Sequence, residues 1–260
     1  MQDKPTLEDT LSVMRDLRAR CEWDAAQTHE SLRPYLIEEA YEVDDAIRSG
    51  DDAKLREELG DLLLQILFHS VLAEERGAFS MHDVAAGFIA KMKGRHPHLY
   101  GEGAKQPWEQ MKARKRDSIV DGLPADLPAL HRAFRLQDRA AGVGFDWPDV
   151  TGPAEKVEEE LNEVREEFRV HPPAPAGSPP EYGAAFERVE EEIGDLLFAV
   201  VNLSRKAGVH PALALDKANV KFARRFGAVE RMAAERGWKP GEATLEQLDT
   251  LWDSVKESER

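Results

Sequence analysis

The residues with the clearest potential for chemistry are acidic pairs at helical spacing. Glu160 precedes Glu163 by three positions, and Glu192 precedes Asp195 by three. Residues three apart on an α-helix project from one face, one turn apart. Because apolar runs such as 196–201 directly adjoin these pairs, we expect the carboxylates to face a cleft between helices rather than open solvent.

The same acidic signature occurs a second time, nearer the N-terminus. This earlier copy consists of Glu39, Glu42, Glu58 and Asp61. Its two halves are separated by 19 positions, from Glu39 to Glu58, and those of the later copy by 32, from Glu160 to Glu192. The difference equals the 13 residues of segment 171–183, which is rich in Pro, Ala and Gly. One loop insertion reconciles the copies, which indicates an internal duplication.

Four carboxylates in one cleft repel one another and have raised pKa values unless a cation neutralises them. Mg²⁺ fits this role, because it prefers oxygen ligands and is commonly shared between protein carboxylates and substrate phosphates. Mn²⁺ is a possible substitute. A di-iron centre would require Glu-x-x-His on two helices, whereas both copies carry Asp where that His would stand, at Asp61 and Asp195.

Composition and charge narrow the class of protein. The chain has 260 residues, of which 42% are hydrophobic and 33% charged, with few β-branched stretches, so an all-α fold is expected. The formal net charge of −15 argues against nucleic acid and anionic membranes as partners. A single cysteine, Cys21, excludes an internal disulfide, and no apolar run reaches the roughly 20 residues of a membrane span. We therefore expect a cytoplasmic protein.

Apolar residues recur with helical periodicity along most of the chain. Helices are predicted near 7–17, 31–48, 52–75, 80–96, 128–141, 153–169, 184–207, 211–236 and 244–257. The segment 171–183 is expected to be a loop, and 142–148 a structured turn. Segment 119–130, which contains Gly and Pro, is predicted to link an N-terminal domain, 1–118, to a C-terminal domain, 131–260.

Eight motifs, in order along nearly the whole chain, resemble the two-domain form of the MazG nucleoside triphosphate pyrophosphohydrolases. Besides the four acidic pairs they are Trp23-Asp24-x-x-Gln27-Thr28, Arg95-His-Pro-His98, Val143-Gly-Phe-Asp-Trp147 and Lys221-Phe-x-Arg-Arg-Phe226. The resemblance implies tandem four-helix-type bundles, a homodimer, and Mg²⁺-dependent hydrolysis of nucleoside triphosphates to the monophosphate and diphosphate. It also implies broad tolerance of the base, as in removal of non-standard nucleotides.

The two copies differ outside their carboxylates. Seven positions after the motif Asp, the second copy has Asn202 and the first has Phe68. With Lys221 aligned to Lys91, the pair Arg225 and Arg95 is kept. The first copy lacks the other polar residues, because the positions of Lys217, Asn219 and Arg224 are occupied in it by Gly87, Ile89 and Gly94. We therefore predict that the C-terminal domain is catalytic, whereas the N-terminal copy binds metal as a secondary site or serves folding and dimerisation.

Roles for the C-terminal copy follow from these comparisons. Glu160, Glu163, Glu192 and Asp195 are predicted to ligate Mg²⁺, and Lys221 and Arg225 to balance charge on the phosphates. Glu159 is either a base beside the metal or a solvated residue. The residues predicted to bind nucleotide on the same surface are Asn202, Lys217, Asn219 and Arg224. Trp252, from the resemblance, packs on the base, or else it is a core aromatic of the last helix.

Two further functions remain open at this level. One is a helical binding protein that senses nucleotides without hydrolysing them. The other is a pyrophosphatase with narrow specificity for one deoxynucleotide. The order of the motifs favours the broad two-domain enzyme over both, and substrate profiling separates the three.

Overall fold

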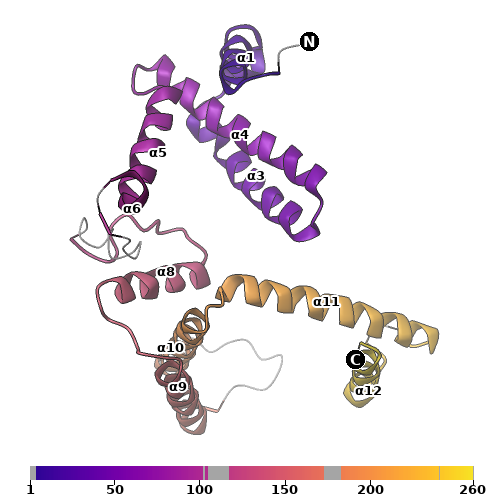
Figure 1. Ribbon diagram of the computed structural model, residues 1–260. Coiled ribbons are helices and arrows are strands. Elements are labelled where there is room, and N and C mark those ends of the chain that lie inside the picture. The colour runs from indigo at the N-terminus through magenta and orange to yellow at the C-terminus, as the bar shows by residue number, and fades with distance from the viewer. Residues whose placement is uncertain (1–3, 102, 105–116, 173–182, 240, 260) are drawn as a thin grey trace. The chain divides into compact units, whose positions relative to one another are not determined.

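The computed structural model describes residues 4–101, 103–104, 117–172, 183–239 and 241–259 (Figure 1). Over these residues the chain forms eleven α-helices and no β-strand. The predicted all-α fold is confirmed. By contacts the chain divides into two compact units, 1–105 and 106–260. The predicted domain bounds, 1–118 and 131–260 with a linker at 119–130, stay a prediction.

The first unit contains four long helices and two short ones. They are α1 (Leu7–Arg20), α2 (Glu22–Ala26), α3 (His29–Ser49), α4 (Asp52–Glu75), α5 (Met81–Arg95) and α6 (Pro97–Tyr100). Side-chain caps set the starts of the long helices: Thr6 forms a capping box with Asp9, and Asp51 accepts from the first backbone amides of α4. Gly50 ends α3 in the left-handed conformation, at φ 69°, which allows the tight turn into α4.

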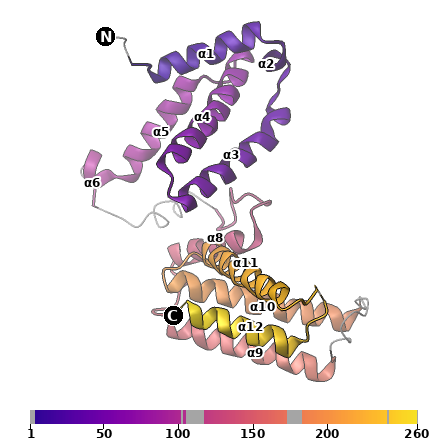
Figure 2. The same cartoon turned by 90° about the vertical axis from the view of Figure 1, so that its right-hand side faces the viewer.

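The described residues of the second unit form five helices, which are drawn in Figure 2. They are α8 (Ala129–Gly142), α9 (Thr151–Val170), α10 (Ala184–Lys206), α11 (Pro211–Glu235) and α12 (Leu245–Ser258). In Figure 1, α11 leads away from the pair α9 and α10, and α12 packs against the far half of α11. The loop predicted at 171–183 lies almost entirely outside the described residues.

The packing of the helices repeats between the units. In the first, α4 packs against α3, α1 and α5; in the second, α10 packs against α9, α8 and α11. This correspondence places the two copies of the acidic signature on equivalent helix pairs, α3 with α4 and α9 with α10. The internal duplication read from the sequence is therefore also visible in which helices touch.

Each unit has its own hydrophobic core. In the first, Leu11 and Met14 of α1 pack against Leu67, Phe68 and Val71 of α4. In the second, a core cluster forms where the far half of α11 meets α12, around Val229, Leu251 and Val255. No helix among the described residues is both long enough and apolar enough to cross a bilayer.

The non-helical segment before α8 is tied to that helix by a buried arginine. Arg139 is 6% exposed, and its guanidinium donates to the carbonyl oxygens of Ile119 at 2.7 Å and Asp121 at 3.0 Å. Sequence reasoning did not single out Arg139. The predicted helices otherwise agree with the observed ones to within a few residues, and the two short helices α2 and α6 were not predicted.

Candidate functional site

The carboxylates of the second copy meet where α9 packs against α10. Glu160 and Glu163 lie on α9, and Glu192 lies on α10. One carboxylate oxygen from each of the three lies within 4.8 Å of the others. Glu160 is 5% exposed and Glu192 is partly buried, as expected for carboxylates that face inward, whereas Glu163 and Asp195 are exposed, so the expectation is wrong for these two. Oxygens this close make a chelating group for a cation.

The like charges of this cluster act on one another. A hydrogen bond to Glu160 is the largest cause of the raised pKa of Glu163, followed by burial and by the charges of Glu160 and Glu192. Burial comes first among the causes that raise the pKa of Glu192, and the charges of Asp195 and Glu160 follow. Without a cation, the cluster therefore retains protons more readily than isolated carboxyl groups do.

Asp195 lies next to this cluster rather than within its closest part. Of the four predicted ligands, it is the one whose oxygens fall outside the 4.8 Å group. Its charge nevertheless contributes to the raised pKa of Glu192, three residues earlier on the same face of α10. The structure thus brings three of the four predicted ligands together and places the fourth beside them.

Lys156 is a charged neighbour of the cluster that sequence reasoning missed. Its Nζ lies 2.6 Å from Oε1 of Glu160 and 2.8 Å from Oε1 of Glu159. These two bonds raise the pKa of Lys156, the bond to Glu159 most. The signal was present in the sequence, because Lys156 stands four residues before Glu160 on a helix. Glu159 itself is exposed and paired with this lysine.

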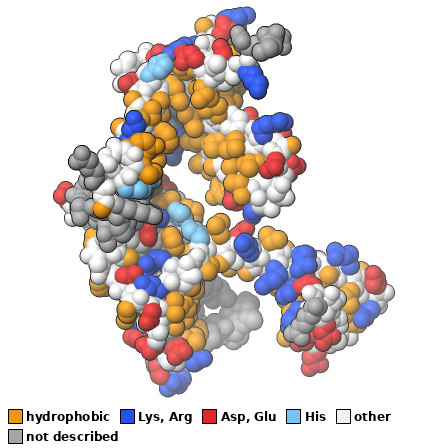
Figure 3. Space-filling view, viewed as in Figure 1, with side chains coloured by type: hydrophobic (Ala, Val, Ile, Leu, Met, Phe, Trp, Pro, Cys, Tyr) orange, Lys and Arg blue, Asp and Glu red, His pale blue; other side chains and the backbone are white. Residues whose placement is uncertain are grey.

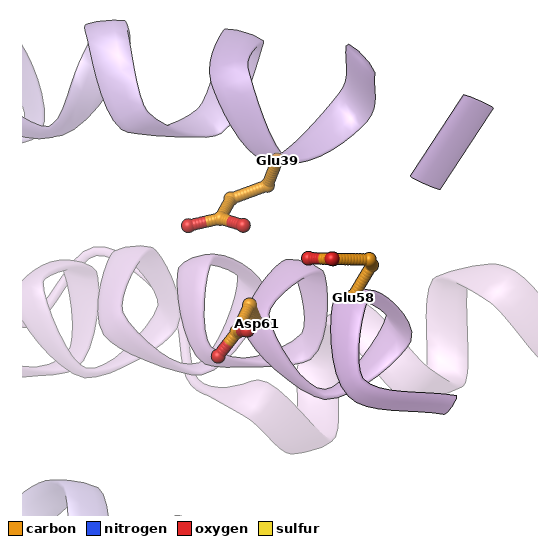
Figure 4. Close-up of side chains that lie close together, drawn as sticks. All are labelled: Glu39, Glu58 and Asp61. Carbon is orange, nitrogen blue, oxygen red and sulfur yellow. The ribbon is translucent and has the colours of Figure 1, made fainter. Parts of the chain in front are cut away.

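The first copy also gathers three of its four carboxylates, but its close group includes Asp61, the counterpart of Asp195, and not Glu42, the counterpart of Glu163. Glu39 on α3 points toward Glu58 and Asp61 on α4 (Figure 4), and oxygens of these three lie within 4.8 Å of one another. Burial is the largest cause of the raised pKa of Glu39, and the nearby charges of Asp61 and Glu42 add to it. Glu42 also shares a hydrogen bond with Glu39. Both copies therefore present a similar anionic cluster.

The donor atoms in both clusters are carboxylate oxygens alone. Such a set suits a hard divalent cation of the Mg²⁺ type and offers no sulfur or imidazole ligand to softer metals. The raised pKa values of Glu163, Glu192 and Glu39 support this fit, because the hydrogen bond, the burial and the neighbouring charges that cause them disfavour the ionised carboxylates, which a cation would stabilise.

Four of the residues predicted to contact nucleotide line a cavity of about 350 Å³ between α11 and α12. They are Asn219, Lys221, Arg225 and Trp252. Trp252 also packs against the core cluster of α11 and α12, and its ring centroid lies 5.4 Å from that of Phe222. Both interpretations of Trp252, base contact and core aromatic, are therefore compatible with its position.

Glu259 pairs with both arginines beside this cavity. The guanidinium of Arg225 approaches Glu259 to 2.7 Å and that of Arg224 to 2.8 Å. The hydrogen bond from Arg225 is the largest cause of the lowered pKa of Glu259. The carboxylate shows where an anionic oxygen fits between the two arginines. Lys217 lies exposed on α11, one turn before Lys221.

The structure does not bring these cations to the carboxylate cluster within one chain. The walls of the 350 Å³ cavity come from α11 and α12, whereas the cluster lies between α9 and α10. Over the described residues, the ion pairs of Arg224 and Arg225 run to Glu259. In the isolated chain these are two separate groups of residues, and their joint role in one site stays a prediction.

We expect Glu163→Gln to stabilise the metal-free protein at neutral pH. The folded-state pKa of Glu163 is raised above its ordinary value of 4.5, so folding favours the protonated carboxyl group. The contribution of this group to the free energy of unfolding is therefore present in acid and is lost as pH rises through the folded-state pKa. The glutamine variant lacks this charge. Its melting temperature in a chelator should exceed that of the unmodified protein at about pH 7.5, and the difference should shrink at about pH 5.

Glu166→Gln is the matched control for this measurement. Glu166 lies on the same helix, is exposed, and pairs with Arg169 rather than with the cluster. It should not raise the melting temperature. A Glu163→Gln protein that melts below the unmodified protein at both pH values contradicts the repulsion inferred for the cluster.

Known proteins resemble this chain over almost its full length. A protein from Thermotoga maritima named nucleoside triphosphate pyrophosphohydrolase/pyrophosphatase MazG is 43% identical over 258 residues, covering 96% of this chain and 95% of its own. The chain belongs to the MazG family. The nucleoside triphosphate pyrophosphohydrolase of Escherichia coli K12 is 41% identical over 258 residues, covering 95% of this chain and 94% of its own.

Other similarities agree with this membership. The MazG nucleotide pyrophosphohydrolase domain matches residues 27–100, which carry the first copy of the acidic signature. An uncharacterised Bacillus subtilis protein, YabN, is 40% identical over 262 residues, which is 96% of this chain but 51% of that protein. The family therefore includes longer proteins in which a region like this one is about half of the whole.

Proposed function

We propose that this MazG-family protein is a Mg²⁺-dependent hydrolase that converts nucleoside triphosphates to nucleoside monophosphates and diphosphate. The observation that carries the proposal is the carboxylate cluster of Glu160, Glu163 and Glu192, in a chain similar over nearly its full length to relatives named nucleoside triphosphate pyrophosphohydrolase. Such a cluster repels a polyphosphate unless cations are bound, and therefore suits a metal–nucleotide substrate.

Glu160, Glu163, Glu192 and Asp195 are the residues proposed to hold the cation. When bound, Mg²⁺ or Mn²⁺ neutralises phosphate charge and makes a bound water a better nucleophile. Lys156 keeps a positive charge against Glu160, which limits the repulsion within the cluster. The three-residue spacing on α9 and on α10 orients the carboxylates toward one another.

Lys221 and Arg225 are proposed to stabilise negative charge on the phosphate oxygens. Arg225 already holds a carboxylate oxygen of Glu259 at 2.7 Å, so its guanidinium is set for an anionic oxygen. Asn219, Lys217 and Arg224 lie on the same helix and are proposed to assist in nucleotide binding. Trp252 stays a candidate contact to the nucleotide.

The C-terminal copy is proposed to be the catalytic one. Both copies have the carboxylates, so the difference lies in what surrounds them. Phe68 in the first copy is 2% exposed in a closed hydrophobic core, where the second copy has Asn202. An apolar core leaves no room for a nucleotide, which supports a role of the first copy in metal binding, folding or dimerisation.

A homodimer is proposed to complete the molecule. Large apolar side chains are exposed along α3, α4 and α5, including Tyr41, Leu59 and Phe88. Figure 3 shows hydrophobic side chains gathered over the first unit on the face turned to the viewer. Exposed apolar side chains also follow α10 and α11, including Leu197 and Phe222. Contiguous apolar surface of this kind is typical of protein interfaces. A second copy would cover it and would also bring one chain's cations to the partner's carboxylates.

Nucleoside triphosphates of several bases are the proposed substrates, and the cytoplasm is the proposed site of action. Incubating the protein with a panel of ribo- and deoxynucleoside triphosphates and Mg²⁺ tests the proposed range of substrates directly. We expect monophosphate and diphosphate as products and turnover of more than one base. Nucleoside diphosphate with orthophosphate contradicts the proposed reaction. Turnover of a single deoxynucleotide supports the narrow enzyme, and binding without turnover supports the sensing protein.

A further inference from the structure

A cavity of about 630 Å³ lies between α8 and α10, beside the turn at 143–148. Three aromatic side chains line it: Phe145, Trp147 and Phe198. A Cβ at Gly152 would lie 2.3 Å from Cε3 of Trp147, so the missing side chain lets the indole pack against the first turn of α9. The cavity therefore offers aromatic faces to a planar ligand, and one of them is held against the helix that carries Glu160.

A buried hydrogen-bond acceptor without a partner belongs to a residue that lines the same cavity. The side chain of Gln137, which is 6% exposed, lines the cavity, and its Nε2 donates to the carbonyl oxygen of Phe198 at 2.8 Å. Because a carbonyl oxygen only accepts, this bond fixes which end of the amide is which. Oε1 of Gln137 is buried and has no hydrogen-bond partner among the described residues. A buried polar atom of this kind normally has a partner.

Asn202 supplies the complementary group. Its Oδ1 accepts from Nε of Arg205 at 3.2 Å and from Nη2 of Arg205 at 2.9 Å. The side-chain amide nitrogen of Asn202, Nδ2, is thereby left to donate. Arg205 also forms an ion pair with Asp146, and Lys206 lies 3.0 Å from the same carboxylate. These ion pairs fasten the turn to α10, so acceptor, donor and aromatic rings are held in one frame.

The first copy shows the same place filled. Asn202 corresponds to Phe68, and the packing of α8 on α10 corresponds to that of α1 on α4. Phe68 is 2% exposed and packs with Leu11 and Met14 of α1 in a closed cluster. One copy of the duplicated unit therefore has core where the other has a cavity with two amides.

The cavity lies on the helix face that carries the carboxylates. Phe198, Asn202 and Arg205 follow Asp195 by three, seven and ten residues, which is the spacing of one face of a helix. At 1.5 Å per residue, Asn202 is about 10 Å along α10 from Asp195. A nucleotide with its phosphates at the cluster spans this separation with its base.

We propose that this cavity binds the base of the nucleoside triphosphate. The inference rests on the proposed function for its ligand and assigns a recognition site within it. The base stacks on the aromatic lining, one of its N–H groups donates to Oε1 of Gln137, and a ring nitrogen or carbonyl accepts from Asn202. All common bases carry both kinds of group, so this site accepts several bases and favours none through these two contacts alone.

Asn202→Phe tests the site by giving the second copy the residue of the first. The probes are a nucleoside triphosphate with a non-hydrolysable bridge between its α and β phosphorus atoms, and inorganic tripolyphosphate, which has no base. Both are titrated with Mg²⁺ by calorimetry. We expect Asn202→Phe to weaken binding of the nucleotide probe at least about tenfold, because the added ring takes the space in which the base would stack, and to leave tripolyphosphate binding unchanged. Gln137→Leu should do the same, more weakly.

Val200→Phe is the matched control, since it adds the same ring to an exposed position two residues earlier on α10. A thermal melt of Asn202→Phe should show a folded protein. Unchanged nucleotide binding in Asn202→Phe, equal loss of both probes, or loss of nucleotide binding in Trp252→Ala alone overturns the inference. A different result separates this inference from the proposed function. If Asn202→Phe weakens binding of the nucleotide probe as expected, but the unmodified protein releases no diphosphate from nucleoside triphosphates, the base site is supported and the proposed hydrolysis is contradicted.

Discussion

Glu163→Gln is expected to reduce diphosphate release from nucleoside triphosphates about a thousandfold, which corresponds to about 4 kcal/mol of lost transition-state stabilisation. The change removes one charged oxygen donor from the group formed with Glu160 and Glu192, whose oxygens lie within 4.8 Å of one another. It keeps the shape of the side chain and relieves repulsion, so the variant should stay folded. The initial rate at saturating Mg²⁺ measures the loss.

The equivalent change in the first copy is the control for this prediction. Glu42→Gln combined with Asp61→Asn removes two of the three carboxylates beside Glu39. If the C-terminal copy is catalytic, this double variant should retain most of its turnover. A loss as large as that of Glu163→Gln would assign the chemistry to the first copy instead.

Lys221→Ala is expected to lower kcat about a hundredfold, the usual effect of removing one charged group that stabilises a developing anion. Lys221 lines the 350 Å³ cavity together with Arg225, and both side chains are cationic. Steady-state kinetics should show the loss mainly in kcat. Arg231→Ala, an exposed position on the same helix, should have little effect. An unchanged kcat in Lys221→Ala removes this lysine from the proposed mechanism.

Mixing inactive variants extends this prediction to the homodimer. In the isolated chain Lys221 lies between α11 and α12, and Glu163 lies in the cluster between α9 and α10. If each site combines the carboxylates of one chain with the cations of its partner, co-refolding Lys221→Ala with Glu163→Gln should restore up to about a quarter of the unmodified rate, because half of the dimers are mixed and each has one intact site. No recovery would mean that both groups act within one chain.

The helices and the carboxylate positions were predictable because they depend on local periodicity. The three-residue spacing of Glu160 and Glu163 fixes their common face on any helix. The pairing of α9 with α10 followed from their apolar faces and from the repeat. These features need only sequence separations of a few residues and a duplicated pattern.

What could not be predicted depends on the direction and packing of particular helices. The sequence gives no measure of how α11 turns after α10, so it could not place Lys221 and Arg225 between α11 and α12, on a different helix pair from the carboxylates. Gln137 carries no motif, and its unpartnered Oε1 appears only when α8 packs on α10. Contacts between residues far apart in sequence decide both points.

The difference between Phe68 and Asn202 has a further meaning for the energetics of the two halves. In the first half the side chain of Phe68 fills this part of the hydrophobic core, whereas in the second half the equivalent space is a cavity beside Gln137. A base that enters this space takes the place of the absent side chain. If so, bound nucleotide completes the packing of the second unit. The folded state of this unit is then more stable with nucleotide bound than after product release.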